Sequence, residues 1–264
     1  MAGRLQRRNG GKEVKKEINI AFTCANYGPM WAPVVASWLR LVGYTSRQFN
    51  LTQVGRLGGV GITDRMYTMT AENTLVQEVL ANPDFTHIFM TEIDMILPHD
   101  AIAKLVALDK DMASGLYFLR SDLPEGRGQP CLYKRAPGMT LEDAQKEYSE
   151  YLHTPVSLFP QMEPFPVDCA GLGCVLVKRE VFEKLPRPWF DLRAGDKVSV
   201  GYGSDIYFYK HARDHGFQLW VDPTVQCGQI DYYETTIADW KWQLDNNPGF
   251  AGRGYIIGQG GPSL

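Results

Sequence analysis

The chain has 264 residues, 44% of them hydrophobic and 22% charged, a composition that excludes disordered, collagen-like and coiled-coil proteins. Its formal net charge of -3 argues against a surface devoted to nucleic acid, and no apolar run approaches the roughly 20 residues that cross a membrane. The five cysteines form no CxxC pair, so we predict reduced thiols in a cytoplasmic protein.

The two ends of the chain differ in composition from the middle. Residues 1–17 are basic with almost no apolar side chains, and residues 246–264 are rich in glycine. We expect a disordered basic tail and a flexible C-terminal segment, because neither can bury enough apolar surface to order itself. A nucleic-acid-binding arm is the less favoured interpretation of the tail, which has no aromatic side chain for stacking. Residues 18–245 are expected to form one domain.

Strands and helices alternate through the first part of this domain. The apolar run at 18–23 predicts a buried strand that ends in a turn at 24–29. After it we expect a helix at 31–42 ending at Gly43, a strand at 45–52, a glycine-rich turn at 55–61, a helix capped by Thr63 or Asp64 and ended by Asn82-Pro83, a strand at 86–90, a helix at 100–108 and a strand at 113–119. Such alternation is typical of a parallel α/β sheet.

The second part is less regular. Residues 121–166 contain many prolines and one charged helical segment at 141–151, which predicts an excursion from the sheet. Beyond it we expect a small-residue strand at 167–177, a helix at 179–185, a loop to Gly203, a helix at 205–215 and a strand at 218–221.

Two carboxylates follow the most apolar strand. Glu92 and Asp94 flank Ile93, and because alternate residues of a strand point the same way, both are predicted on one side of the sheet edge. A shared divalent cation would relieve their repulsion, and hard oxygen ligands suit Mg²⁺ or Mn²⁺. The alternative is that they cap the next helix or meet solvent.

A third acid, Asp205, follows a flexible Gly-Tyr-Gly-Ser turn and opens a helix. There it can serve as an ordinary N-cap, a role that Ser204 could also fill, or as a general base that deprotonates an acceptor hydroxyl.

Other motifs narrow the choice of chemistry. The small residues of 168–174 would let a substrate or another backbone approach closely. This segment lacks the spacing of the dinucleotide fingerprint, and the chain has no GxxxxGK[ST], HExxH or GxSxG motif. NAD binding is therefore disfavoured, and P-loop NTPases, HExxH zinc proteases and serine hydrolases of the GxSxG type are not indicated.

Taken in order, several segments resemble the GT-A nucleotide-sugar glycosyltransferases, in the family-2-like group that includes many bacterial and phage enzymes. These segments are CANYGPMW, NPDFTHIFMTEIDMILPHDAI, DMASGLYFLR, DCAGLGCVLVKREVFEKLPRPWF and GYGSDIYFYKHARDHGFQLWVDPTV. The resemblance implies a single Rossmann-like α/β domain with a mostly parallel central sheet and helices on both faces. It also implies a nucleotide-sugar half at 18–120 and an acceptor half at 121–245.

The resemblance further implies roles for individual residues. Glu92 and Asp94 stand at the family's DxD motif and would hold Mn²⁺ or Mg²⁺ on the donor diphosphate. Asp205 falls at the catalytic base of inverting members. The loop after the first strand would contact the nucleoside, and it comprises Thr23, Ala25, Asn26 and Tyr27.

Three positions depart from the family pattern, and the first is Glu92, a glutamate where the DxD motif has an aspartate. An arginine-asparagine pair that faces the diphosphate is replaced by Glu72-Asn73, so Asn73 is retained and Arg65 is the candidate substitute for the arginine. The histidine that completes the metal shell is replaced in its region by Gln229, which offers a weaker carbonyl oxygen.

The implied function is metal-assisted, inverting transfer of a sugar from a nucleotide diphosphate-sugar, UDP-sugar by default, to an acceptor hydroxyl. Glycan, lipid-linked sugar, protein and modified DNA base all remain open as acceptors. The alternatives are a nucleotidyltransferase on a similar sheet and a non-catalytic module that binds glycan or nucleic acid.

Overall fold

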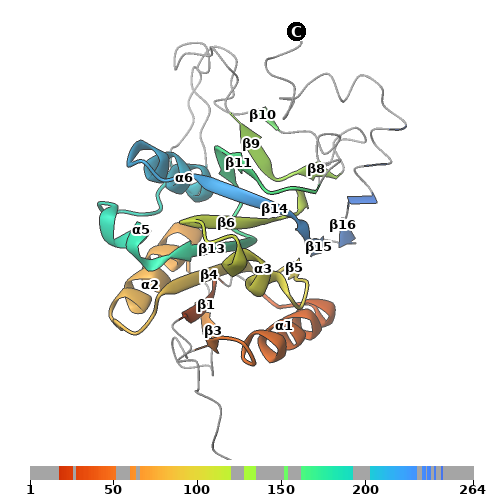
Figure 1. Cartoon of the computed structure of the whole chain (residues 1–264), viewed down its shortest axis with the longest axis horizontal. Helices are drawn as coiled ribbons and strands as arrows, with labels where there is room; N and C mark the ends of the chain where they lie inside the picture. The colour runs from red at the N-terminus through yellow and green to blue at the C-terminus, as the bar shows by residue number, and fades with distance from the viewer. Residues whose placement is uncertain are drawn as a thin grey trace, which may run out of the picture.

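The computed structural model describes residues 18–25, 28–51, 60–63, 66–119, 128–134, 152–153, 162–192, 203–230, 234–235, 237–238, 241 and 245. Their centre is an eight-stranded sheet (Figure 1). Its strand order is β11 (Phe165–Val167), β14 (Leu219–Gln226), β6 (Met112–Leu116), β13 (Cys174–Lys178), β4 (His87–Glu92), β1 (Asn19–Ala25) and β2 (Asn50–Leu51), with β3 (Val60–Ile62) also paired to β1.

Most strands of this sheet run in one direction. Strands β1 to β4 are mutually parallel, β6 and β14 point the same way, and only β13 and β11 are antiparallel to their neighbours within the sheet as described. The carboxyl ends of β1 and β4 therefore meet at one edge, where ligands bind in open α/β sheets. Ala25 is paired with Glu92 there.

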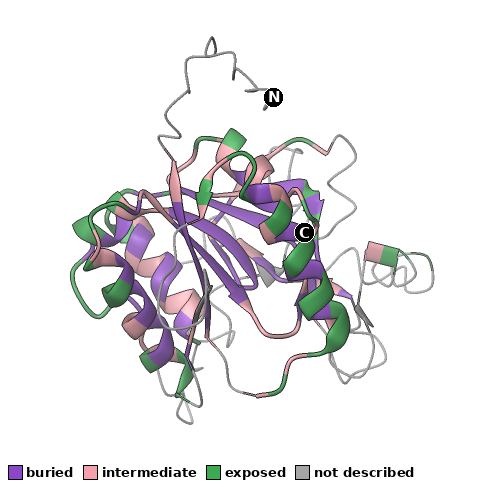
Figure 2. Ribbon diagram, turned by 90° about the horizontal axis from the view of Figure 1, so that it is seen from below, coloured by how far each residue is buried: buried purple, intermediate pink, exposed green. Residues whose placement is uncertain are grey.

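Helices cover both faces of the sheet. One layer holds α2 (Thr68–Leu80), α5 (Arg179–Lys184) and α6 (Ser204–Asp214), and the other holds α1 (Ala32–Thr45) and α3 (Ala101–Ala107). Strand β4 serves both, because Ile88 and Met90 pack on the first layer while Phe89 packs on the second. The central strands are buried between helices that expose their outer sides (Figure 2). The predicted fold class, α/β with a mostly parallel sheet and helices on both faces, is confirmed.

Short strands extend the edge of this core. They form three small sheets: β5 (Met95–Ile96) with β15 (Gly228–Ile230) and β16 (Glu234–Thr235), β7 (Phe118–Leu119) with β8 (Gln129–Pro130), and β9 (Leu132–Lys134) with β10 (Leu152–His153) and β12 (Cys169–Ala170). No helix within the described ranges is long and apolar enough to cross a bilayer.

Several predicted boundaries were wrong. Gly43 lies inside α1, which continues to the buried Thr45, so the strand expected from Thr45 shrinks to Asn50–Leu51. Helix α2 begins after Tyr67 rather than at Thr63. The expected strand at 113–119 is interrupted at Tyr117, whose carbonyl accepts the Cys131 N–H.

The single strand expected at 167–177 is three separate strands in three pairings, β11, β12 and β13. These long-range pairings override local propensity. Of the glycine-rich turn predicted at 55–61, residues 60 and 61 belong instead to β3, and residues 55–59 lie outside the described residues. The predicted tails at 1–17 and 246–264, the helix at 141–151 and Asp64 also lie outside them.

Candidate active site

A pocket of about 210 Å³ opens at the carboxyl ends of β1 and β4. Strand β1 contributes Thr23 and Ala25, and the end of β4 with its turn contributes Glu92 and Asp94. Helix α2 closes another side with Thr68, Glu72 and Leu75. The two predicted DxD acids therefore line one cavity. Thr23 is also anchored by its hydroxyl, which donates to the Phe89 carbonyl at 3.0 Å.

The turn that carries Asp94 is held from three directions. The Trp38 indole N–H donates to the Met95 carbonyl at 3.2 Å, and the Ser37 hydroxyl accepts the Leu97 N–H at 3.2 Å. The Ile230 N–H donates to the Asp94 carbonyl at 2.8 Å. Helix α1 and strand β15 therefore fix the backbone of the turn, and with it the Asp94 carboxylate.

Gln229, the predicted replacement for the metal-binding histidine, lies against Asp94. Its amide Nε2 donates to Asp94 Oδ2 at 3.0 Å, and its backbone pairs with Met95 in the β15–β5 ladder. The amide oxygen Oε1 is buried and accepts no hydrogen bond within the described residues. In this orientation the amide positions the Asp94 carboxylate and keeps an unused carbonyl oxygen beside it.

Glu92 is an acid in an acidic environment. Burial of its carboxylate, followed by the charges of Asp94, Asp205 and Glu72, raises its pKa to about 8. Four carboxylates thus act on one another at this edge of the sheet. The arrangement favours a cationic partner, because positive charge would stabilise the ionised forms.

Asp205 stands at the start of α6, two residues after the N-cap Gly203. Its Oδ1 accepts the Ile206 N–H at 2.8 Å, so the carboxylate lies over the helix N-terminus. Burial raises the pKa of Asp205, while its bonds to the Ile206 and Asp205 N–H groups oppose that rise. A Cβ at Gly203 would lie 2.7 Å from Asp205 Oδ1, which explains the glycine in the preceding turn.

Glu72 is the acid that the sequence reasoning missed as a site residue. It lies on the buried side of α2 with Leu75, Val76 and Val79, and it is only 4% exposed. The Ser204 hydroxyl donates to its carboxylate, and burial together with the charge of Asp205 raises its pKa to about 8. The available signal was a carboxylate on the apolar side of an amphipathic helix, where an unpartnered charge is costly.

Asn73 has a different place from the one expected. Its Nδ2 donates to the carbonyls of Met69 at 2.8 Å and Phe190 at 2.7 Å, and its Oδ1 accepts the Trp189 and Phe190 N–H groups at 3.1 and 3.3 Å. The amide is fully used in joining α2 to the 189–190 loop. As placed, Asn73 does not line the pocket.

The small residues of 168–174 make room for a side chain rather than for substrate. A Cβ at Gly171 would collide with the Tyr117 hydroxyl, and one at Gly173 would lie 2.8 Å from Met95 Sδ. The Tyr117 hydroxyl accepts the Gly173 N–H at 3.2 Å. The glycines therefore allow Tyr117 to pack beneath the DxD turn, a correction to the expected close approach of a ligand.

Comparison with known proteins identifies the fold of the chain but no sequence relative. No protein-family model matches the chain, and no curated protein matches its sequence. Among solved structures it is similar to GalNAc-T7 with UDP, GalNAc and Mn²⁺, with a TM-score of 0.54 and 11% identity over 88% of this chain and 48% of that one. The fold is GT-A. The chain thus spans about half the length of GalNAc-T7.

Two other solved structures are more distant in shape. One is A197 from STIV, with a TM-score of 0.49 and 15% identity over 81% of this chain and 86% of that one. The other is the catalytic domain of Drosophila β1,4-galactosyltransferase 7 in complex with xylobiose, with a TM-score of 0.36 and 15% identity over 84% and 68%.

The metal-ligating side chains of this pocket fit a cation that is also bound by a ligand, not one that is coordinated by the protein alone. Within the described ranges, no three His, Cys, Asp or Glu side chains are grouped closely enough to hold a metal ion. Mg²⁺ is commonly bound by one or two carboxylates together with substrate phosphates, and Glu92 and Asp94 supply that number. The predicted nucleoside contacts Asn26 and Tyr27, and the predicted Arg65, lie outside the described residues.

Proposed function

We propose that the protein is a metal-assisted glycosyltransferase that moves a sugar from a nucleotide diphosphate-sugar to an acceptor hydroxyl. The observation that carries the proposal is the presence of Glu92 and Asp94 in one pocket at the open end of a GT-A sheet, with Asp205 outside the pocket lining but near enough for its charge to raise the pKa of Glu92. The GT-A likeness supplies only the fold, so the activity is argued from these three side chains.

Asp205 is proposed as the base of an inverting transfer. Its carboxylate accepts the proton of the acceptor hydroxyl as that oxygen attacks the anomeric carbon and the nucleoside diphosphate leaves from the opposite side. Burial raises the pKa of Asp205 and makes it a better base, while the Ile206 N–H holds its orientation.

Glu92 and Asp94 are proposed to hold Mn²⁺ or Mg²⁺ against the donor diphosphate. A bound cation would offset the negative charge that grows on the departing diphosphate. Without a cation the repulsion is relieved by a proton on Glu92, whose pKa is about 8, and a bound cation would stabilise the doubly ionised pair instead. None of the described residues that line the pocket is Lys, Arg or His.

The test is product analysis with a panel of nucleotide-sugars that includes UDP-galactose and UDP-N-acetylgalactosamine, with Mn²⁺ or with EDTA. We expect release of a nucleoside diphosphate that requires the cation. Asp94→Asn and Asp205→Asn should each reduce it by roughly 100-fold or more with the circular dichroism spectrum unchanged. Asp214→Asn, at the exposed far end of α6, is the matched control and should keep full activity.

Other products would replace the proposal. Pyrophosphate released from a nucleoside triphosphate would indicate a nucleotidyltransferase. Binding of nucleotide-sugar with neither transfer nor hydrolysis would indicate a non-catalytic binding module.

A further inference from the structure

We propose that Glu72 reads the donor sugar, accepting hydrogen bonds from its hydroxyl groups. The inference rests on the proposed function, since it assigns the sugar-binding side of the same pocket. It names a specificity-determining residue on α2 that lines the same pocket as Glu92 and Asp94.

The geometry of Glu72 is that of a prepared acceptor. The side chain is 96% buried and lines the pocket together with Thr68 and Leu75 of the same helix. One carboxylate oxygen is fixed by the Ser204 hydroxyl, whereas Oε2 is buried without a hydrogen-bond partner among the described residues. A buried acceptor with no partner is costly, so a ligand that donates to it would gain affinity.

The surroundings of Glu72 select the kind of ligand. A phosphate without its cation would be repelled from the ionised Glu72, and the charges of Glu92 and Asp205, which act electrostatically in the same region, would add to that repulsion. A neutral group that donates hydrogen bonds satisfies the site, and sugar hydroxyls have this chemistry.

The tether through Ser204 connects this acceptor to the proposed base. Ser204 donates to Glu72, and the next residue in α6 is Asp205. A sugar held by Glu72 would therefore lie near the N-terminus of α6. Asp205, the proposed base for the acceptor hydroxyl, is at that end of the helix. Sites built to bond a hydroxyl discriminate strongly against analogues that lack it, because the buried acceptor is then left unpaired.

The experiment compares the wild type, Glu72→Gln and the control Glu78→Gln, a matched change on the exposed side of α2. Dissociation constants are measured with Mn²⁺ for UDP, UDP-galactose and UDP-N-acetylgalactosamine, and for GDP and GDP-mannose. The sugar increment is the ratio of the constant for a nucleoside diphosphate to that for its sugar conjugate. We expect Glu72→Gln to reduce the increment of the preferred sugar by about 10- to 100-fold and to leave the free diphosphate within about twofold.

The outcomes separate this inference from the proposed function. Binding of no nucleotide by the wild type would overturn both. Binding of nucleotide with an increment unaltered in Glu72→Gln, or an equal loss for diphosphate and conjugate, would overturn only the role of Glu72. Weaker Mn²⁺ binding by Glu72→Gln without nucleotide would make Glu72 a metal ligand and would also overturn it.

A second variant guards against loss of folding. Ser204→Ala keeps the Glu72 carboxylate and removes its tether, so we expect a smaller loss of the sugar increment, near threefold to tenfold. An unchanged increment in Ser204→Ala together with an unchanged increment in Glu72→Gln would exclude the acceptor role.

Discussion

The two ends of strand β4 treat charge in opposite ways. At the amino end, Lys178 forms ion pairs with Asp109 at 3.0 Å and Asp111 at 3.6 Å, and the neighbouring His87 is held neutral. At the carboxyl end, Glu92 faces the charges of three other acids and its pKa is raised to about 8. The first end satisfies its charges within the protein, and the second leaves them for a ligand. Repulsion that lowers stability is thus concentrated where the function is proposed.

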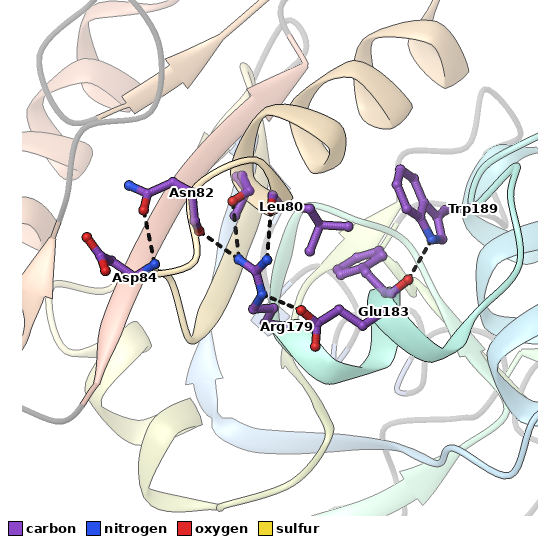
Figure 3. A network of polar contacts seen from close by, with 8 residues as sticks. Leu80, Asn82, Asp84, Arg179, Glu183 and Trp189 are labelled. Atoms are coloured by element: carbon purple, nitrogen blue, oxygen red, sulfur yellow. Dashed lines mark hydrogen bonds and ion pairs between the residues drawn. The ribbon is translucent and has the colours of Figure 1, made fainter.

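Arg179 shows how completely the amino end is satisfied. From the start of α5 its guanidinium donates to the carbonyls of Asn82 at 2.7 Å and Leu80 at 2.8 Å, and its Nε donates to Glu183 at 2.6 Å (Figure 3). These carbonyls belong to the C-terminus of α2, where cations are favoured. One side chain therefore ties α2 to α5 on the side remote from the pocket.

The largest expected effect is the pH dependence of the acidic end. Because Glu72 and Glu92 have pKa values of about 8 in the folded protein and about 4.5 when unfolded, their contribution to stability is present below pH 4.5 and is lost as the pH rises through 8. In EDTA, Glu72→Gln/Glu92→Gln should be less stable relative to wild type at pH 5 than at pH 8, by on the order of 7 kcal/mol, roughly half from each glutamate. Urea unfolding at each pH measures this difference.

The control for that measurement is Glu78→Gln/Glu180→Gln, both at exposed positions, which should show no such trend. If the stability difference between Glu72→Gln/Glu92→Gln and wild type were the same at pH 5 and pH 8, the picture of uncompensated acids would be contradicted. Mn²⁺ should reduce the fall of the wild-type free energy of unfolding between pH 5 and pH 8, since a cation stabilises the ionised carboxylates.

The next effect breaks the amino end. Arg179→Ala removes the donors to the Val79 and Leu80 carbonyls of α2 and to the Asn82 carbonyl just beyond it. It should lower the free energy of unfolding by about 3 kcal/mol, which is roughly 6 to 12 °C in Tm for a chain of this size. Thermal unfolding measures it. Lys184→Ala removes an exposed ion pair with Glu180 and a cation–π contact at 5.7 Å from the Phe217 ring, and should change stability by less than about 1 kcal/mol. Equal effects of the two variants would refute the capping role.

The sequence predicted that Glu92 and Asp94 share one side of the sheet end, and both line the pocket, but not through strand alternation: β4 ends at Glu92 and Asp94 lies in the turn before β5. The glycine turn before a helix predicted the position of Asp205 at the start of α6, and its role stays a prediction. Glu72 required knowledge of how α2 packs against α6, 132 residues away, where Ser204 meets its carboxylate. Local periodicity contains no information about that contact.

For the fold, too, local patterns were predictable from the sequence and long-range contacts were not. Alternation of apolar segments was sufficient to predict β1, β4 and the helices between them, and hence the parallel half of the sheet. Strand β13 inserts antiparallel between β4 and β6, and the glycines before it are explained by Tyr117, more than fifty residues earlier. A small-residue segment predicts that something approaches closely, but it does not identify the partner.

The smallest expected effect comes from His87, whose contribution to stability is lost as the pH falls, whereas that of Glu72 and Glu92 is lost as the pH rises. Burial and the neighbouring Lys178 lower its pKa to about 4 from an ordinary 6.5, so its contribution to stability is present above pH 6.5 and is lost as the pH falls through 4. As the pH falls from 7 to 4, the free energy of unfolding of His87→Gln, measured with urea, should therefore rise by about 2 kcal/mol relative to that of the wild type. Exposed His215→Gln should follow the wild type across this range. Parallel curves for His87→Gln and wild type would mean that the amino end accommodates a charged imidazole, and the contrast between the two ends of β4 would then rest on the acids alone.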